Sequence, residues 1–212
     1  MGRHYHEEQS IFSSKAAVSA TFTANVNNTI TSTAHGLSNG NVITVANSGG
    51  ALPTGLSAST YYYIISAATD TFEVSTTVGG SAVDITGAGS GTNTWYQEFE
   101  GTPILIPDYQ FAVVTFNTSG SANVTLKCVG AISSTPPTFL NAQSTTNRYD
   151  FIQMLDYEDW NPLDGDTGLA FAAADDQRLF RVNFDGLMWL NFKTLNFKAG
   201  TLNVRCKVFS ND

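Results

Sequence analysis

Hydrophobic and polar residues alternate along this chain in short runs, which is the pattern of β-strands rather than helices. One example is the run in which Phe180, Val182 and Phe184 alternate with two polar residues. The runs are separated by glycine, serine, threonine, asparagine and proline, the residues that form turns. No window shows the period of a long amphipathic helix. The pattern therefore predicts an all-β protein.

The strand pattern divides the chain into three pieces. Residues 1–20 are a polar leader, expected to be an N-terminal arm or a first strand. Residues 21–96 form a small module of β-sandwich or barrel-like type, and residues 97–212 a jelly-roll-like or Ig-like antiparallel β-sandwich. If the leader supplies a strand to the sandwich, the module is inserted after it. The strands expected in the module are 21–26, 29–33, 41–45, 60–66, 71–75, 82–85 and 94–99.

The larger piece contains two short stretches of similar sequence, which we call the sequence echo. Aligning Gly120 with Gly200 also pairs Asn123 with Asn203, Val124 with Val204 and Lys127 with Lys207. Each copy is predicted to be a β-hairpin that turns at its glycine. Two equivalent hairpins suit the two halves of a β-sandwich. The match is short, so a true duplication and a shared hairpin solution both stay open.

Composition narrows the classes of partner. The formal net charge is −8, and the few Lys and Arg residues are scattered, so we expect no nucleic-acid binding. Charged residues make up 13% of the chain, about half the usual fraction. Such a surface suits a protein that packs beside copies of itself. No apolar stretch approaches the roughly 20 residues of a membrane span, and the N-terminus lacks the hydrophobic centre of a signal peptide, so no membrane association is expected.

The two cysteines, Cys128 and Cys206, each lie on the apolar face of an alternating run. Free cysteine behaves there as a small hydrophobic residue. We therefore expect two reduced core thiols. A disulfide is the alternative, because the sequence does not give the distance between the two Cα atoms.

Carboxylates are concentrated in an acidic loop over residues 156–166. Within it, Asp164 and Asp166 flank a glycine and are candidate oxygen ligands for Ca²⁺. The register of an EF-hand is missing, because no glutamate closes a twelve-residue loop. Aspartate and glycine are also ordinary turn residues, so solvated turns are the favoured interpretation. A pair of glycosidase carboxylates is a third alternative, which would need a sugar cleft.

The histidines indicate little chemistry. On a strand His4 and His6 would face the same way, and across a threefold axis such a pair is a candidate metal site; a polar arm is the alternative. His35, the remaining histidine, is expected to be structural. Since no Ser or Cys nucleophile has an evident base, we expect neither an enzyme nor a cofactor.

Two groups of aromatic residues are candidates for an interface or a ligand. Tyr61, Tyr62 and Tyr63 place rings on both faces of one strand, so at least one ring is expected to be exposed or in a contact. Trp160 lies in a loop beside Asn161. Aromatic side chains at such places suit protein interfaces or stacking on sugars. Burial against neighbouring strands is the alternative.

One stretch of the module resembles a known family. The motif is His35-Gly36-Leu37, then Gly40-Asn41-Val42, followed by the strands Tyr61–Ile65 and Thr71–Val74. It resembles the HGL-type modules of tailed-bacteriophage virion proteins, which occur mostly in tail and tail-fibre proteins and in other exposed structural components. The resemblance covers about a third of the chain. The run from DGDTGLAF to DDQRLFRVNFDGLMWLNF is also similar to β-sandwich proteins encoded among phage head and tail genes.

The resemblance implies a non-enzymatic structural component of a tailed-phage virion, made in the host cytoplasm and located in the virion. A capsid decoration or cement role is expected, because the chain is short and shows no coiled-coil or β-helical shaft. By family analogy the protein would be a trimer bound to the major capsid protein. The alternative is a tail-fibre, tail-tip or neck and tail-tube component, with a host surface glycan as a ligand.

Overall fold

A computed structural model describes residues 7–184 and 186–210, and all regular structure in that part is β-strand. The described residues include no helix that is long and apolar enough to cross a membrane. The chain forms two compact units. The smaller unit, called the barrel below, is Ala17–Glu98 with Leu195–Lys198, and the larger unit is made of the chain up to Ala16, Phe99–Thr194 and the chain from Ala199. The prediction of an all-β protein with two units is confirmed.

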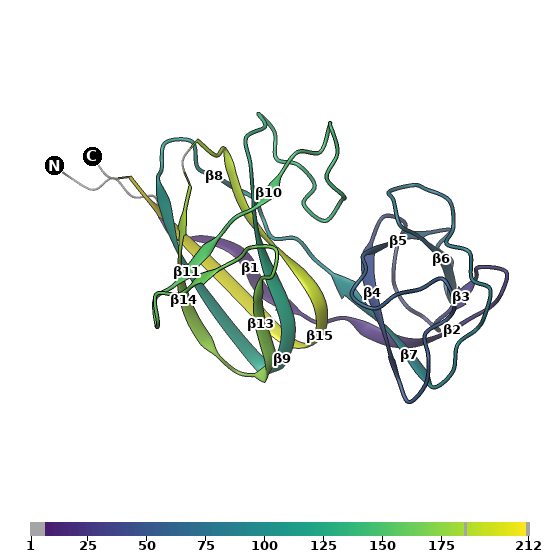
Figure 1. The fold of residues 1–212 in the computed structure, drawn as a ribbon. Coiled ribbons are helices and arrows are strands. Elements are labelled where there is room, and N and C mark those ends of the chain that lie inside the picture. The colour runs from purple at the N-terminus through teal and green to yellow at the C-terminus, as the bar shows by residue number, and fades with distance from the viewer. Residues whose placement is uncertain (1–6, 185, 211–212) are drawn as a thin grey trace. The chain divides into compact units, whose positions relative to one another are not determined.

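The smaller unit is a closed antiparallel barrel with the strand order β2-β3-β6-β5-β4-β7. In Figure 1 these strands surround a common centre. Closure leaves the sheet without an unpaired edge. The strand expected at 82–85 is absent, although Val83 donates a backbone hydrogen bond to Val74. The strands are β2 (Ser19–Ala24), β3 (Ile30–Thr31), β4 (Val42–Ser48), β5 (Tyr62–Ile65), β6 (Thr71–Ser75) and β7 (Thr92–Glu98).

Trp95 is the largest side chain in the barrel core. It is 1% exposed and packs in a cluster that includes Ile43, Ile64 and Phe72. Its indole Nε1 donates a hydrogen bond to Ser32 Oγ over 2.9 Å, so the polar edge of the ring is satisfied inside the core. The barrel is therefore organised around one hydrogen-bonded tryptophan.

The larger unit is a nine-stranded antiparallel sheet that folds over on itself. Its first strand, β1, pairs with the last, β15, so part of the polar leader belongs to this sheet. The six strands of the barrel lie between β1 and β8 along the chain. The strands are β1 (Gln9–Ala16), β8 (Ile104–Leu105), β9 (Phe111–Ala131), β10 (Asp150–Phe151), β11 (Met154–Asp156), β12 (Pro162–Leu163), β13 (Leu169–Ala174), β14 (Gln177–Asn183) and β15 (Trp189–Phe209).

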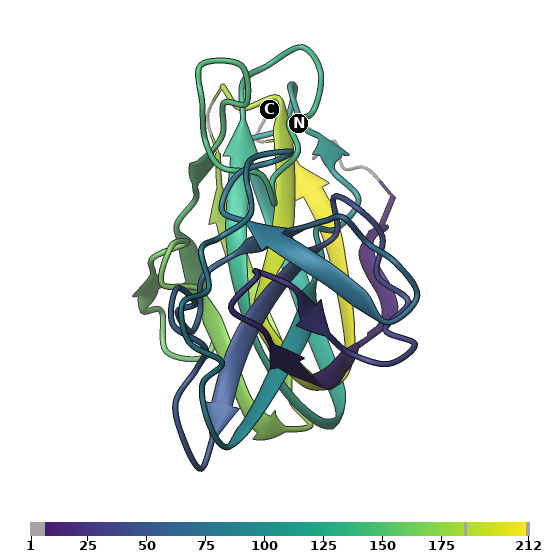
Figure 2. The ribbon, with the colours of Figure 1, turned by 90° about the vertical axis from the view of Figure 1, so that its right-hand side faces the viewer.

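The prediction of two hairpins is wrong, because β9 and β15 are single strands of 21 residues each. The two strands pair with each other. Gln110 donates to Phe209 O at one end and Met188 donates to Ala131 O at the other, so the strands run antiparallel. On its other side β9 pairs first with β14 and then with β13. Figure 2 shows the teal β9 beside the yellow β15.

The glycines of the sequence echo are corners in these long strands. Gly120 and Gly200 have φ of 71° and 84°, and the two residues meet where β9 and β15 bend. The bend carries the strands from one layer to the other, as in sandwiches whose strands switch sheets at corners. Phe116 then faces Phe192 of the opposite layer, with ring centroids 5.2 Å apart and an edge-on angle of 81°. A glycine between two alternating runs is therefore compatible with either a bend in one long strand or the turn of a hairpin.

Both cysteines are free and buried in the larger unit, which confirms the expected reduced thiols. Burial raises the pKa of Cys128 well above its usual value, and the neighbouring Cys206 thiol acts in the same direction. Burial likewise raises the pKa of Cys206 to about 12. The two thiols therefore stay protonated and act as apolar core groups.

Candidate functional site

The residues of the HGL motif shape a turn of the barrel. His35 is 7% exposed, and its Nδ1 accepts a hydrogen bond from the Leu37 amide over 2.9 Å. The imidazole packs edge-on against Phe72 of β6, with centroids 5.0 Å apart. Gly36 and Gly40 both have positive φ, which glycine adopts without steric cost. The motif that carries the family resemblance thus supports the fold of the barrel.

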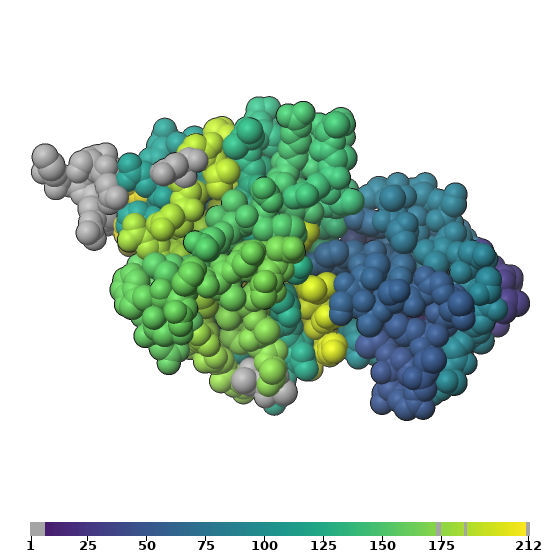
Figure 3. Space-filling view, viewed as in Figure 1, coloured from purple at the N-terminus to yellow at the C-terminus, as the bar shows by residue number. Residues whose placement is uncertain are grey.

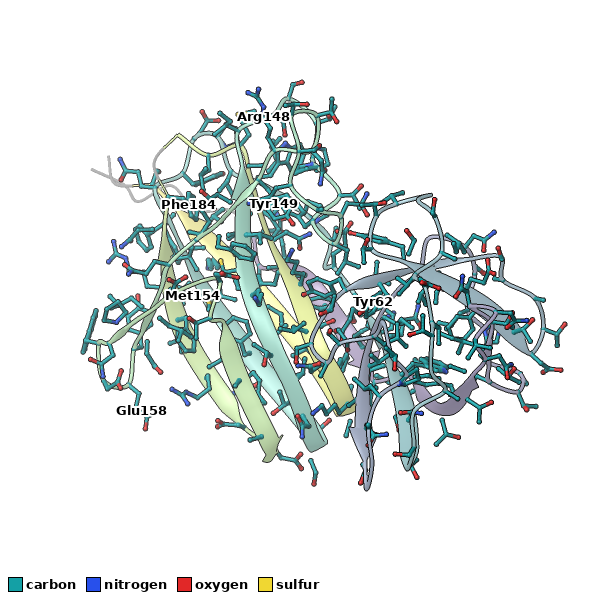
Figure 4. The ribbon with its side chains drawn as sticks, turned by 45° about the vertical axis from the view of Figure 1, so that its right-hand side comes forward. Tyr62, Arg148, Tyr149, Met154, Glu158 and Phe184 are labelled. Atoms are coloured by element: carbon teal, nitrogen blue, oxygen red, sulfur yellow. The ribbon has the colours of Figure 1, made fainter. Side chains whose placement is uncertain are left out.

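Two of the three candidate tyrosines are unsuitable for a ligand. Tyr62 and Tyr63 are 2% and 3% exposed, and Tyr61 is half-buried. The Tyr62 hydroxyl accepts a hydrogen bond from the Ser57 amide over 2.8 Å, and Figure 4 shows this side chain within the barrel. The alternation in the sequence places rings on both faces of β5, but it does not show that both faces are covered. Tyr62 and Tyr63 are therefore removed from the candidate interface residues.

Trp160, in contrast, is exposed at the turn between β11 and β12. The side chain is 59% exposed and its backbone has φ of +60°. The Trp160 amide donates to Asp156 O over 3.0 Å, and the Tyr157 amide donates to Leu179 O of β14 over 3.0 Å. The Tyr157 and Trp160 rings meet edge-on with centroids 5.3 Å apart. The amide hydrogen bonds fix the backbone of the turn, and the ring contact with Tyr157 leaves most of the indole at the surface.

Arg178 of β14 lies beside this turn among carboxylates. Its Nη2 donates to Asp156 Oδ2, its Nε lies 3.7 Å from Glu158 Oε2, and its Nη1 lies 3.9 Å from Asp176 Oδ2. Partial burial acts to lower the pKa of Arg178, but the three carboxylates outweigh it and raise the pKa above its usual value. The guanidinium is therefore a permanent cation. In the sequence this arginine falls on the same strand face as Phe180 and Val182, and a charge at an apolar position is a signal that pattern reasoning missed.

Two open hollows lie against this cluster and share Asp156 and Arg178. The larger, of about 640 Å³, also includes Tyr157, Glu158 and Leu179 in its lining. The smaller, of about 170 Å³, is lined in addition by Asp159, Asn161 and Pro162. We call the two hollows together the Arg178 groove. In Figure 4 Glu158 lies at the outer end of the turn while Met154 of β11 lies nearer the sheets, and Figure 3 shows the green region around residues 150–165 as outer surface.

The two calcium candidates, Asp164 and Asp166, stabilise a turn and form an ion pair. Asp164 Oδ1 accepts the Asp166 amide over 2.8 Å, and Asp166 Oδ1 lies 2.8 Å from Lys127 Nζ. Within residues 7–184 and 186–210, no group of three or more His, Cys, Asp or Glu side chains is placed to hold a metal ion. The contacts match the solvated-turn interpretation of this loop. His4 and His6, the candidates for a metal on a threefold axis, lie outside the described residues.

A buried lysine secures the long loop between β9 and β10. Lys193 is 2% exposed, and its Nζ donates to Phe139 O over 2.8 Å and to the Tyr149 hydroxyl over 2.9 Å. Nearby, Glu100 Oε2 accepts the Leu140 amide over 2.7 Å, and burial raises the pKa of Glu100. Sequence reasoning missed this cluster, because Lys193 shares a strand face with the polar Asn191 and looks like an ordinary polar position. The hydrogen bonds of Lys193 to Phe139 O and to the Tyr149 hydroxyl join strand β15 to the loop, which indicates a structural role.

The titration of Lys193 gives a testable pH dependence. Burial, aided by the charge of Lys127, lowers the pKa of Lys193 from 10.5 to about 8. Between these two pH values the unfolded chain binds more protons than the folded chain, so stability rises with pH. Relative to a Lys193→Met variant, we expect the free energy of unfolding to rise by on the order of 3 kcal/mol as the pH increases across this window. Below the window Lys193 is protonated in both the folded and the unfolded chain, so the difference between the two proteins does not change with pH. Urea unfolding at a series of pH values measures this, and parallel curves for the two proteins would contradict it.

Comparisons of the chain with known proteins find two remote structural similarities. No protein-family model matches the chain, and no curated protein sequence matches it. The solved structure of the SPBc2 prophage-derived protein YomS is similar, with 11% identity, a TM-score of 0.37, and coverage of 53% of this chain and 82% of that one. The PBSX exported protein XepA is similar with 8% identity, a TM-score of 0.37, and coverage of 99% and 82%. Similarity at this level does not establish a common fold.

Proposed function

We propose that this chain is a non-enzymatic structural subunit of a tailed-bacteriophage particle, acting as a capsid decoration or cement protein. The observation that carries the proposal is the HGL module. Its motif residues, in the order that resembles virion modules, build one closed barrel through the His35 turn and the core around Trp95. The partners would be further copies of this chain, as a trimer, and the major capsid protein. Burial of apolar area between many copies would stabilise the particle by mass action.

The low charge density supports this role. With 13% charged residues, copies of the chain would approach one another without strong repulsion. Exposed apolar side chains are present on both units, including Val26 and Val78 on the barrel and Leu105 and Ile132 on the larger unit. Such residues provide area for contacts between subunits.

A cryo-electron microscopy map of the particle tests the proposal. We expect density for this chain on the capsid, in copies that follow the capsid symmetry. Particles assembled without the chain are expected to release their genome at a lower temperature, because the binding energy of the subunits is lost. Density confined to the tail would overturn the cement role. It would instead favour the alternative of a tail-fibre, tail-tip or neck component. The exposed Trp160 suits such a component if it binds a ligand.

A further inference from the structure

Trp160 is the one exposed aromatic side chain among residues 7–184 and 186–210. A positive φ, here +60°, is unfavourable for a bulky residue. The backbone conformation of Trp160 is therefore stabilised by the contacts of the turn. Tyr157 packs against the indole from one side and leaves much of the ring open to solvent. An exposed ring that is already positioned loses little conformational entropy when a ligand stacks on it.

Trp160 lines neither hollow of the Arg178 groove but borders both, because its ring contacts Tyr157 of the larger hollow and its chain neighbours Asp159 and Asn161 line the smaller one. The polar groups of the groove are suited to hydroxyl groups. Arg178 supplies N–H donors, and the carboxylates of Glu158 and Asp176 supply acceptors, all lining the same hollow. The Asp156 carboxylate is 6% exposed and already accepts from Arg178 and from the Glu158 amide, so it positions the guanidinium. The Glu158 side chain is 78% exposed, so a ligand can reach it. A sugar hydroxyl both donates and accepts, and neighbouring hydroxyls on a ring can therefore bridge a carboxylate and a guanidinium. The ring C–H groups of the same sugar form an apolar face with positive partial charge, which matches the negative face of an indole.

The charge of the groove selects among ligands. One guanidinium stands against four carboxylates, those of Asp156, Glu158, Asp159 and Asp176, for a formal net charge of −3. An acidic sugar or a phosphate would be repelled at this site. A protein partner would normally bury an apolar centre there, whereas the lining is mostly polar. The larger hollow, of about 640 Å³, is open to solvent and has room for a sugar ring.

From these observations we propose that the Arg178 groove binds a pyranose ring of an uncharged glycan. The ring stacks on Trp160, and its hydroxyls bond to Glu158 and Arg178. The inference goes beyond the structural role proposed above and does not depend on whether the chain lies on the capsid or on the tail.

Binding is tested with the full chain on an array of uncharged oligosaccharides built from glucose, galactose, mannose and N-acetylhexosamines, alongside matched sialylated and uronic-acid forms. We expect the protein to bind at least one uncharged oligosaccharide with a Kd in the millimolar range or tighter, and to bind the acidic forms at least tenfold more weakly. Calorimetric titration of the best oligosaccharide then gives the Kd for each variant.

Three variants locate the site. Trp160→Ala is expected to weaken binding at least tenfold, whereas Trp160→Phe keeps a ring and loses less. Glu158→Gln keeps one acceptor oxygen, so it should weaken binding several-fold and narrow the discrimination against acidic sugars. Ile132→Ala, a change at a 67% exposed residue of the same unit that does not line the groove, is the matched control and should bind as the parent does. Thermal melting of each variant shows whether the fold is retained.

The proposal is overturned if no uncharged oligosaccharide binds, if only acidic sugars bind, or if Trp160→Ala binds as tightly as the parent. Loss of association with another virion protein in Trp160→Ala, without any glycan binding by the parent, would show that the groove is a protein contact and would also overturn it.

Discussion

Replacing Gly200 with alanine is expected to destabilise the larger unit by at least about 3 kcal/mol, or to prevent its folding. The reason lies at the corner of β15. Gly200 has φ of +84°, and an added Cβ would lie 2.4 Å from Ala122 Cα and 2.6 Å from Ser119 O. Both of these are backbone atoms of β9, so the clash cannot be relieved by rotating a side chain. The conformational cost of a left-handed residue is added to this clash.

Gly120→Ala is the matched control, because it changes the partner glycine at the same corner. Gly120 also has a positive φ, of +71°, but its added Cβ would meet only Gly200 Cα at an ordinary 3.5 Å. The expected cost is therefore the conformational term alone, about 1 kcal/mol. Urea unfolding followed by far-ultraviolet circular dichroism gives both values. Equal losses in the two variants would show that the corner is not packed as described.

The second large effect is expected in the barrel. Trp95→Ala should lower the free energy of unfolding by about 3–5 kcal/mol, since it removes the largest side chain of the barrel core and leaves a cavity. Trp95 is 1% exposed, so solvent cannot fill the space without entering the core. Differential scanning calorimetry measures the change without relying on the fluorescence of the deleted indole. A loss below about 1 kcal/mol would contradict the assignment of Trp95 to the core.

Two milder variants separate volume from hydrogen bonding at this position. Ser32→Ala leaves the buried indole N–H without its acceptor, at a cost of about 1–3 kcal/mol. In Trp95→Phe the donor itself is absent, and the Ser32 hydroxyl keeps its hydrogen bond to Thr21 O, which is 2.9 Å long. Trp95→Phe is therefore expected to cost less than Trp95→Ala.

The site residues differ from the residues that carry the family resemblance. His35, Gly36 and Leu37 act within the barrel, where their contacts shape a turn. The groove with charged groups lies in the larger unit around Arg178, and the exposed Trp160 borders it on the turn between β11 and β12. The HGL motif therefore indicates the kind of protein in which the barrel occurs. The chemistry of a ligand has to be inferred from the residues of the Arg178 groove.

Several features could be predicted from the sequence because they depend on local pattern. Alternation identified the strands of the barrel apart from 82–85, and the same alternation placed Cys128 and Cys206 in the core. Trp160 was a candidate because an aromatic residue beside Asn161 and a proline belongs to a loop. Each of these inferences uses only the side-chain period of a strand or the chemistry of a turn.

Other features depend on which strands become neighbours, and no local pattern contains that information. Gly120 and Gly200 became corners rather than hairpin turns because β9 pairs with β15 and not with itself. Tyr62 and Tyr63 are both buried because the second face of β5 is covered as well.

The sequence by itself determined that the chain is all-β, with two units and with both cysteines on apolar strand faces, because alternation and turn residues act over a few positions. Only the tertiary structure decided that the barrel closes, that the sheet of the larger unit folds over at two glycines, and that Arg178 of β14 meets Asp156 of β11 beside Trp160. These outcomes depend on contacts between residues far apart in the chain, whose pairing is set by the packing of the whole core.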